Sequence, residues 1–245
     1  MSRFRAVVFD CYQTLVSLPT DGRERAFDDL AQRLGLSLPP GELHRRWRQM
    51  GRELGPNDPR PRRPPLDGPV ASFRSFGDLW LERFGEFFRR LNIDAEPSVG
   101  VDAYVRAHTV AVPFPDVRPA LEALRGHYRL AVLSDADTSF LEASVASTGV
   151  SFDVVLSSEE VGAYKPHVSI FREMSRRLEV GPSGIVYVGD GLWSDVAGAK
   201  NAGMAAVWLN RESRARAEED AAPDWEIASL EELPALLEAQ RAGES

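Results

Sequence analysis

Cysteine is nearly absent from this sequence of 245 residues, in which Cys11 is the only one. A single cysteine excludes an intrachain disulfide framework and any zinc site built from cysteines. No apolar run approaches the roughly 18 residues that a membrane-spanning helix needs. The opening residues MSRFRAVVFD do not have the pattern of a secretory signal. We therefore expect a soluble, cytoplasmic protein with no membrane partner.

Positive charge is in deficit. The formal net charge is −8 and the pI is about 5.2, and no basic stripe follows any part of the chain. Nucleic acid is therefore not an expected partner. An acidic protein that handles an anionic molecule needs its positive charge concentrated at the binding site.

Short apolar runs bounded by turn residues indicate buried strands. The runs are nearly continuous, which is typical of strands covered on both faces of a parallel sheet. Segments with apolar residues at helical spacing separate most of them, and this alternation predicts an α/β fold with a Rossmann-like, doubly wound parallel sheet. The predicted strands are 5–10, 128–134, 153–158, 184–190 and 205–210, and the predicted helices are 116–126, 138–148, 167–178 and 193–202.

The segment between the first two predicted strands is far longer than one crossover helix requires. It has helical spacing over 21–35, 40–54, 72–92 and 98–109, and it contains a loop rich in proline, glycine and charge at 55–69. The prolines of PFPDVRP (113–119) mark the return to the sheet. We interpret residues 17–112 as an inserted α-helical cap domain, and residues 1–16 with 113–245 as the core domain.

Polar side chains stand where several of the predicted strands end. In an open parallel sheet, ligands bind beyond the carboxyl ends of the strands, so these side chains should converge on one crevice. One such residue is weak evidence, whereas a set of acids, a hydroxyl and a lysine at successive strand ends is strong evidence for a catalytic site. The residues are Asp10, Ser134, Asp135, Lys165, Asp190 and Asp195.

Four stretches of the sequence resemble the successive motifs of the haloacid dehalogenase superfamily. They are VVFDCYQTL, VLSD, GAYKPHVSIF and YVGDGLWSDVAGAKNAGM, and they occur in the order of that superfamily. PFPDVRPALEAL is also similar to the approach to its second motif. The resemblance covers the whole chain, and the helical segment falls where the superfamily has its first cap. It implies a hydrolase.

The resemblance also implies roles for individual residues. Asp10 would be a nucleophilic carboxylate that forms a covalent intermediate, which water then hydrolyses. Thr14 and Ser134 would hydrogen-bond the transferring group. Lys165 would neutralise charge beside Asp10 and keep its carboxylate ionised.

The phosphatase branch of the superfamily binds Mg²⁺ at this site. The resemblance places the ion on Asp10, the main-chain carbonyl of Tyr12 and Asp190, with Asp195 bound directly or through water. Hard oxygen ligands suit Mg²⁺.

Tyr12 departs from the phosphatase pattern. Those enzymes usually carry a second aspartate at this place, which protonates the leaving oxygen. A phenol, with an ordinary pKa of about 10, cannot readily take over that role. A tyrosine here is instead a feature of the 2-haloacid dehalogenases, in which halide leaves without a proton. RWRQM (46–50) is similar to the segment that carries their substrate-binding arginine, which would be Arg48. We predict substrate contacts for Arg48, and also for Tyr12 and Asp135 in the core motifs.

Other residues favour the phosphatase branch. Asp190 and Asp195 form the acidic, metal-binding version of the fourth motif, whereas dehalogenases have serine and asparagine there and use no metal. Phe171 stands where dehalogenases have a tyrosine. Gln13 and Asp135 replace a usual glycine and a usual asparagine of the superfamily.

Three hypotheses remain open at this level. The first is a Mg²⁺-dependent phosphatase of a small phosphate ester, favoured because a pair of carboxylates in the fourth motif is hard to justify without a metal. The second is a metal-independent hydrolytic dehalogenase of small 2-haloacids. The third is a non-catalytic protein that binds a phosphorylated ligand. In each case the expected partner is a small anionic molecule, and the expected assembly is a monomer or homodimer.

Overall fold

The computed structural model describes residues 3–18, 22–55, 58–61, 64–70, 72–109 and 111–242. The chain divides into two compact units. The first comprises Met1–Ser17, Arg62–Phe73 and Val112–Ser245, and the second comprises Leu18–Pro61 and Arg74–Ala111. No helix in the described part of the chain is long and apolar enough to cross a membrane.

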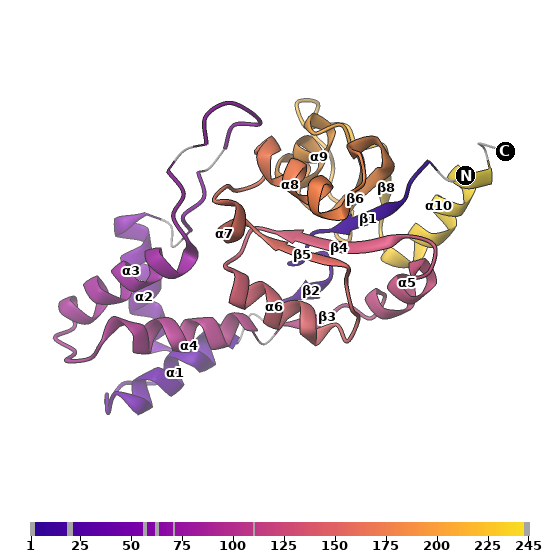
Figure 1. Ribbon diagram of the computed structural model, residues 1–245. Coiled ribbons are helices and arrows are strands. Elements are labelled where there is room, and N and C mark those ends of the chain that lie inside the picture. The colour runs from indigo at the N-terminus through magenta and orange to yellow at the C-terminus, as the bar shows by residue number, and fades with distance from the viewer. Residues whose placement is uncertain are drawn as a thin grey trace. The chain divides into compact units, whose positions relative to one another are not determined.

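The first unit is built on a six-stranded parallel sheet with the order β5-β4-β1-β6-β7-β8 (Figure 1). Its central strand β1 is a continuous apolar run, AVVF, that is fully buried, as expected for a strand covered on both faces. The strands are β1 (Ala6–Phe9), β4 (Arg129–Ser134), β5 (Val154–Ser157), β6 (Ile185–Gly189), β7 (Ala205–Leu209) and β8 (Trp225–Ile227).

Helices cover both faces of this sheet, which confirms the predicted Rossmann-like, doubly wound fold. Figure 1 shows α8 and α9 on one face and α5, α6 and α10 on the other. The apolar core on the α8 side joins Val8 of β1 and Tyr187 of β6 to Ile170 of α8. The helices are α5 (Val117–Leu124), α6 (Thr138–Ser147), α7 (Ser158–Val161), α8 (Val168–Leu178), α9 (Gly198–Asn201) and α10 (Leu233–Ala242), with 3₁₀ turns η1 (Pro182–Gly184) and η3 (Leu230–Glu232).

The predicted helix 193–202 differs from a regular α-helix. It begins as the π-helical turn η2 (Leu192–Ala197) and continues as α9. Such π turns are rare and are frequently found at functional sites. Here the turn carries Asp195.

The two ends of the long insert lie next to each other, because each begins or ends in a short strand and the two strands pair. The short strands β2 (Val16–Ser17) and β3 (Val112–Pro113) pair antiparallel. Part of the insert also packs in the first unit, since the Leu66 carbonyl accepts hydrogen bonds from the Val168 amide at 2.8 Å and from Asn201 Nδ2 at 3.1 Å. The second unit therefore does not include every residue between β2 and β3.

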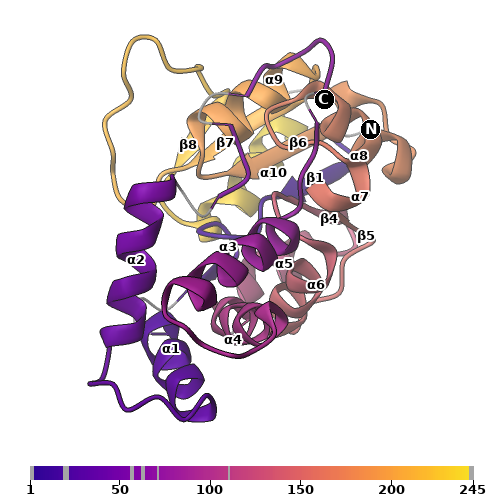
Figure 2. The same ribbon diagram turned by 90° about the vertical axis from the view of Figure 1, so that its left-hand side faces the viewer.

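The described part of the second unit contains the helices α1 to α4 (Figure 2). Aromatic side chains form its core. Trp47 stacks on Phe84 with ring centroids 4.2 Å apart, and Phe27 and Tyr104 surround this pair. The apolar residues that recur at helical spacing in this segment therefore form the contacts between its helices. The helices are α1 (Gly22–Arg33), α2 (Glu42–Leu54), α3 (Phe76–Arg90) and α4 (Pro97–Thr109).

Candidate active site

Asp10 follows β1 directly, at the carboxyl end of the parallel sheet. Its amide donates a hydrogen bond to the Val188 carbonyl at 2.9 Å, so the main chain is held by the neighbouring strand β6. Ser134, the last residue of β4, donates its hydroxyl to Asp10 Oδ1 at 2.8 Å. Two strands that flank each other in the sheet thus bring together two residues that are far apart in the sequence.

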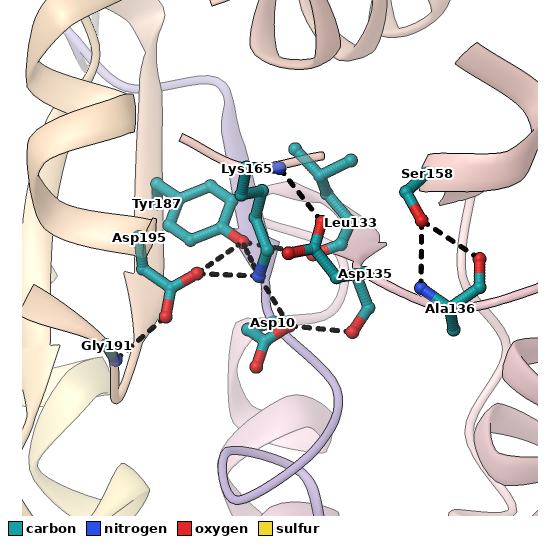
Figure 3. Close-up of polar contacts among 10 residues, drawn as sticks. Asp10, Leu133, Asp135, Ala136, Ser158, Lys165, Tyr187, Gly191 and Asp195 are labelled. Atoms are coloured by element: carbon teal, nitrogen blue, oxygen red, sulfur yellow. Dashed lines mark hydrogen bonds and ion pairs between the residues drawn. The ribbon is translucent and has the colours of Figure 1, made fainter. Parts of the chain in front are cut away.

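Lys165 is the charged centre of the cluster. Its ammonium donates hydrogen bonds to Asp10 Oδ1 at 2.7 Å, Asp195 Oδ1 at 2.6 Å and the Tyr187 hydroxyl at 3.2 Å (Figure 3). The side chain is 3% exposed. Its main-chain amide donates to Asp135 Oδ1 at 2.9 Å, so Asp135 fixes the backbone that carries the lysine.

Three carboxylates meet beside the lysine. One oxygen each of Asp10, Asp190 and Asp195 lies within 4.8 Å of the others. Asp195 is held in place because its Oδ2 accepts the Gly191 amide at 2.8 Å. A side chain at Gly189 would crowd this acid, since a Cβ there would lie 2.5 Å from Asp195 Cγ. The glycines therefore allow the π turn to fold its acid back onto the end of β6.

Burial and mutual repulsion shape the ionisation of this cluster. Burial, Asp195 and Asp10 raise the pKa of Asp190 to about 7 from its ordinary 3.8. Burial also raises the pKa of Asp10, while the Lys165 ammonium acts in the opposite direction. Burial lowers the pKa of Lys165, but Asp10 and Asp195 outweigh it and hold that pKa well above its ordinary value. The lysine therefore stays charged, and the acids lack enough positive charge to balance them.

The raised pKa of Asp190 predicts a pH-dependent stability. A carboxyl whose pKa is raised in the folded state contributes stability below its ordinary pKa of 3.8, and this is lost as the pH rises through about 7. Asp190→Asn should therefore raise the melting temperature of the EDTA-treated protein at pH 8 and change it little at pH 4. Thermal unfolding across this range measures the effect, and an equal shift at both pH values would contradict this assignment.

Two arginines from the loop after β7 support the site, and the sequence pattern did not single them out. Arg214 donates to the Asp190 carbonyl at 2.8 Å, and its guanidinium lies 3.9 Å from Asp190 Oδ2. Arg211 donates to the Thr14 carbonyl at 2.9 Å and forms a two-point ion pair with Asp116. The only sequence signal was their position after a predicted strand, in a segment with many charged residues.

Tyr12 and Thr14 lie in the turn after Asp10. The Tyr12 hydroxyl pairs with Ser144 Oγ at 3.2 Å, and burial raises the pKa of this phenol above its ordinary value. The Thr14 hydroxyl is buried and has no hydrogen-bond partner among the residues that the structure describes. An unpaired buried hydroxyl is costly, so it is suited to a ligand that supplies the missing partner.

Gln13, between them, has a φ of 64°, in the left-handed region that favours glycine. A glycine would adopt this conformation without strain, whereas glutamine adopts it at a conformational cost.

Arg48 lies on α2 in the second unit, where its side chain is exposed. A surface pocket there is lined entirely by that helix, through Glu42, Arg45, Arg46, Arg48, Gln49 and Arg52. The predicted substrate contact of Arg48 stays a prediction.

Comparison with known proteins identifies the family. The model of the haloacid dehalogenase-like hydrolases matches residues 4–203. The chain therefore belongs to the haloacid dehalogenase-like hydrolases, which confirms the resemblance read from its four motifs.

Relatives of two kinds share nearly the full length of the chain. The glyceraldehyde 3-phosphate phosphatase of Methanopyrus kandleri is 33% identical over 94% of this chain and 95% of its own. The (S)-2-haloacid dehalogenase 2 of Pseudomonas sp. (strain CBS-3) is 28% identical over 97% of both. Among solved structures, a 2-haloacid dehalogenase from Pseudomonas syringae pv. Tomato DC3000 is 27% identical over 96% of this chain and 99% of its own, with a TM-score of 0.69. The family thus includes both activities suggested by the sequence.

Proposed function

We propose that this hydrolase is a Mg²⁺-dependent phosphatase that acts on a small phosphate ester through an aspartyl intermediate. The observation that carries the proposal is the cluster of Asp10, Asp190 and Asp195. Three buried or half-buried acids leave excess negative charge, even with Lys165 beside them and the Arg214 guanidinium 3.9 Å from Asp190. A divalent cation would balance that charge. Phosphate release, measured once with Mg²⁺ and once with EDTA, tests the proposal.

The residues present fit Mg²⁺. The carboxylate oxygens are hard donors, they converge within 4.8 Å, and burial with repulsion from Asp195 and Asp10 raises the pKa of Asp190. Asp10, Asp190 and Asp195 would hold the ion, together with the Tyr12 carbonyl. When bound, Mg²⁺ would offset phosphate charge in the transition state.

The hydrogen bonds of Asp10 suit a nucleophile. Oδ1 accepts from Ser134 and Lys165, which fixes the plane of the carboxylate. Oδ2 has no hydrogen bond to any residue in the described part of the chain, so it is available to attack phosphorus. The new O–P bond forms as the bond to the leaving oxygen breaks, and water then cleaves the aspartyl phosphate to restore the carboxylate.

Lys165 provides a fixed positive charge beside this reaction. It remains protonated because Asp10 and Asp195 hold its pKa well above the ordinary value. A permanently charged ammonium cannot donate a proton at operating pH, so its role is electrostatic and positional. Thr14, with its buried and unpaired hydroxyl, is suited to donate a hydrogen bond to the phosphoryl group.

Tyr12 limits the leaving groups that this site can expel. Its phenol is engaged with Ser144, and burial raises its pKa further from the operating pH, so it is a poor general acid for an alkoxide. Aryl phosphates, whose leaving groups need no proton, should therefore turn over about 10²–10⁴-fold faster than alkyl phosphates, the usual contribution of a general acid. Steady-state rates on a matched aryl and alkyl series measure this difference.

Tyr12→Phe is the control for this prediction. It removes only the hydroxyl, so rates on aryl phosphates should stay within about threefold of the wild-type rates. Equal rates on aryl and alkyl phosphates, or a large loss of rate in Tyr12→Phe, would show that the phenol takes part in the reaction.

Hydrolytic dehalogenation of small 2-haloacids is the second candidate function. Tyr12 favours it, because a halide leaves without a proton and the chain has a tyrosine, not an aspartate, two residues after Asp10. The dehalogenase relatives agree with this reading. We also propose that the second unit is the substrate-selecting cap of the enzyme, and that Arg48 would bind the substrate carboxylate in such a reaction. This function predicts full activity in EDTA and its loss in Arg48→Ala.

A further inference from the structure

Tyr187 lies at the centre of the site but belongs to none of the predicted roles. It is in the middle of β6, a strand whose other residues are apolar, and it is 1% exposed. Its ring packs against Phe171 with centroids 5.3 Å apart. Its hydroxyl extends past this apolar core and reaches Lys165 and Asp195, each at 3.2 Å (Figure 3).

The hydrogen-bond capacity of Lys165 explains this contact. A protonated lysine carries three N–H donors and no acceptor. The three acceptors around Lys165 Nζ are Asp10, Asp195 and Tyr187. The side chain is 3% exposed, so water does not readily replace one of them. Tyr187 therefore completes the coordination of a buried ammonium.

The single proton of the Tyr187 hydroxyl has a suitable acceptor of its own. The Leu133 carbonyl of β4 lies 3.0 Å away, closer than Asp195 Oδ1 at 3.2 Å, and β4 is separated from β6 by β1. Donation to that carbonyl turns the lone pairs of the hydroxyl away from β4, where they can receive an N–H from Lys165. A neutral acceptor suits this place, because Asp10 and Asp195 already supply two carboxylates to the same ammonium.

We propose that Tyr187 is a positioning residue that fixes the Lys165 ammonium between Asp10 and Asp195. The phenol sets the rotation of the ammonium, so that one N–H points at the nucleophile and one at the acid of the π turn. This inference rests on the proposed roles of Asp10 and Lys165 for its effect on catalysis. The contact itself can be tested without any substrate.

The sequence offers an unusually direct probe, because Lys165 and Lys200 are its only lysines. Protein labelled with ¹⁵N-lysine should give one ammonium signal from buried Lys165 and one from Lys200, whose side chain is 41% exposed. The variant Lys200→Arg identifies the Lys165 signal. In Tyr187→Phe, the Lys165 ammonium protons should exchange with water about tenfold faster, the ratio that one hydrogen bond supports.

The kinetic readout separates positioning from binding. Tyr187→Phe should lower kcat about 10- to 100-fold, as loss of a supporting partner does in comparable sites, and leave KM within about threefold. Tyr128→Phe is the matched control, since Tyr128 precedes β4 at the opposite end of the strand from Ser134. Its kcat and its Lys165 signal should equal those of the wild type.

Unchanged proton exchange of Lys165 in Tyr187→Phe would overturn the proposal, as would a kcat within twofold of the wild type. If Tyr187→Phe does not fold, incorporation of 3-fluorotyrosine keeps the ring but weakens the oxygen as an acceptor. The Lys165 signal should then shift while the Lys200 signal does not, and an unshifted Lys165 signal would refute the contact. Failure of the phosphatase function would leave these signals unaffected, so the two ideas can fail separately.

Discussion

Asp10→Asn should abolish turnover, with kcat at least about 10⁴-fold below that of the wild type. The amide oxygen can still accept from Ser134 and Lys165, which hold Asp10 Oδ1 at 2.8 and 2.7 Å. The fold and the site geometry should therefore persist, and the loss should come from chemistry, because an amide does not act as the nucleophile. Rates measured at saturating substrate, with circular dichroism to verify folding, test this expectation.

A control and an isotope label make the result specific. Glu122→Gln, an exposed acid of α5 in the same unit, removes one negative charge without touching the site and should keep the wild-type rate. In ¹⁸O-water, hydrolysis of an aspartyl phosphate at phosphorus places the label in the released phosphate. Hydrolysis of an aspartyl ester at its carboxyl carbon places the label in Asp10 itself. Substantial activity in Asp10→Asn would remove Asp10 from the role of nucleophile.

Removal of Mg²⁺ should have the second large effect. EDTA should lower phosphatase turnover by at least about 10²–10³-fold, because the metal supplies several kcal/mol of charge stabilisation in such reactions. Without the ion, Lys165 is the only cation that hydrogen-bonds Asp10 and Asp195 in the described structure. Activity should return on addition of Mg²⁺, and it should not return in Asp190→Asn. Retention of full phosphatase activity in EDTA would refute a catalytic metal.

The core of the fold could be predicted from the sequence because its signals are local. Continuous apolar runs specify strands buried on both faces, and the structure places β1, β4, β5, β6 and β7 within the predicted ranges. Strand β8 and helix α10 were missed. Strand β8 has only three residues, Trp225–Ile227, and such a short edge strand is defined by its pairing with β7 and not by an apolar run of its own.

The candidate site was partly predictable once the strands were known, because its residues stand at strand ends. Asp10 and Ser134 follow from the rule that ligands meet at the carboxyl ends of parallel strands, and the structure brings them together. Tyr187 and Arg214 were not predictable, since their contacts depend on which strands are neighbours and on how a loop folds back. In sequence terms Tyr187 is one more apolar residue of a buried strand. Only the three-dimensional arrangement shows that its hydroxyl reaches Lys165.

Tyr12 and the neighbouring acids favour different reactions, and neither the sequence nor the structure decides between dehalogenation and phosphate-ester hydrolysis. The residue type of Tyr12 matches dehalogenases, and its raised pKa and its contact with Ser144 make it a weak proton donor. The cluster of Asp10, Asp190 and Asp195 could hold a metal ion, as the resemblance to phosphatases predicts. Of two relatives that share nearly the full length of the chain, one is a phosphatase and the other is a haloacid dehalogenase. The reaction therefore depends on whether the acids bind a metal, and neither Tyr12 nor the cluster of acids specifies this by itself.

One assay tests this central claim most directly. Purified protein is given a panel of phosphate esters and 2-haloacids, each in Mg²⁺ and in EDTA, and phosphate and halide release are both measured. The proposed function predicts phosphate release from aryl esters in Mg²⁺, its loss in EDTA, and no halide release in either condition. Halide release that persists in EDTA, with no phosphate release in Mg²⁺, would contradict it and would establish the metal-independent dehalogenase.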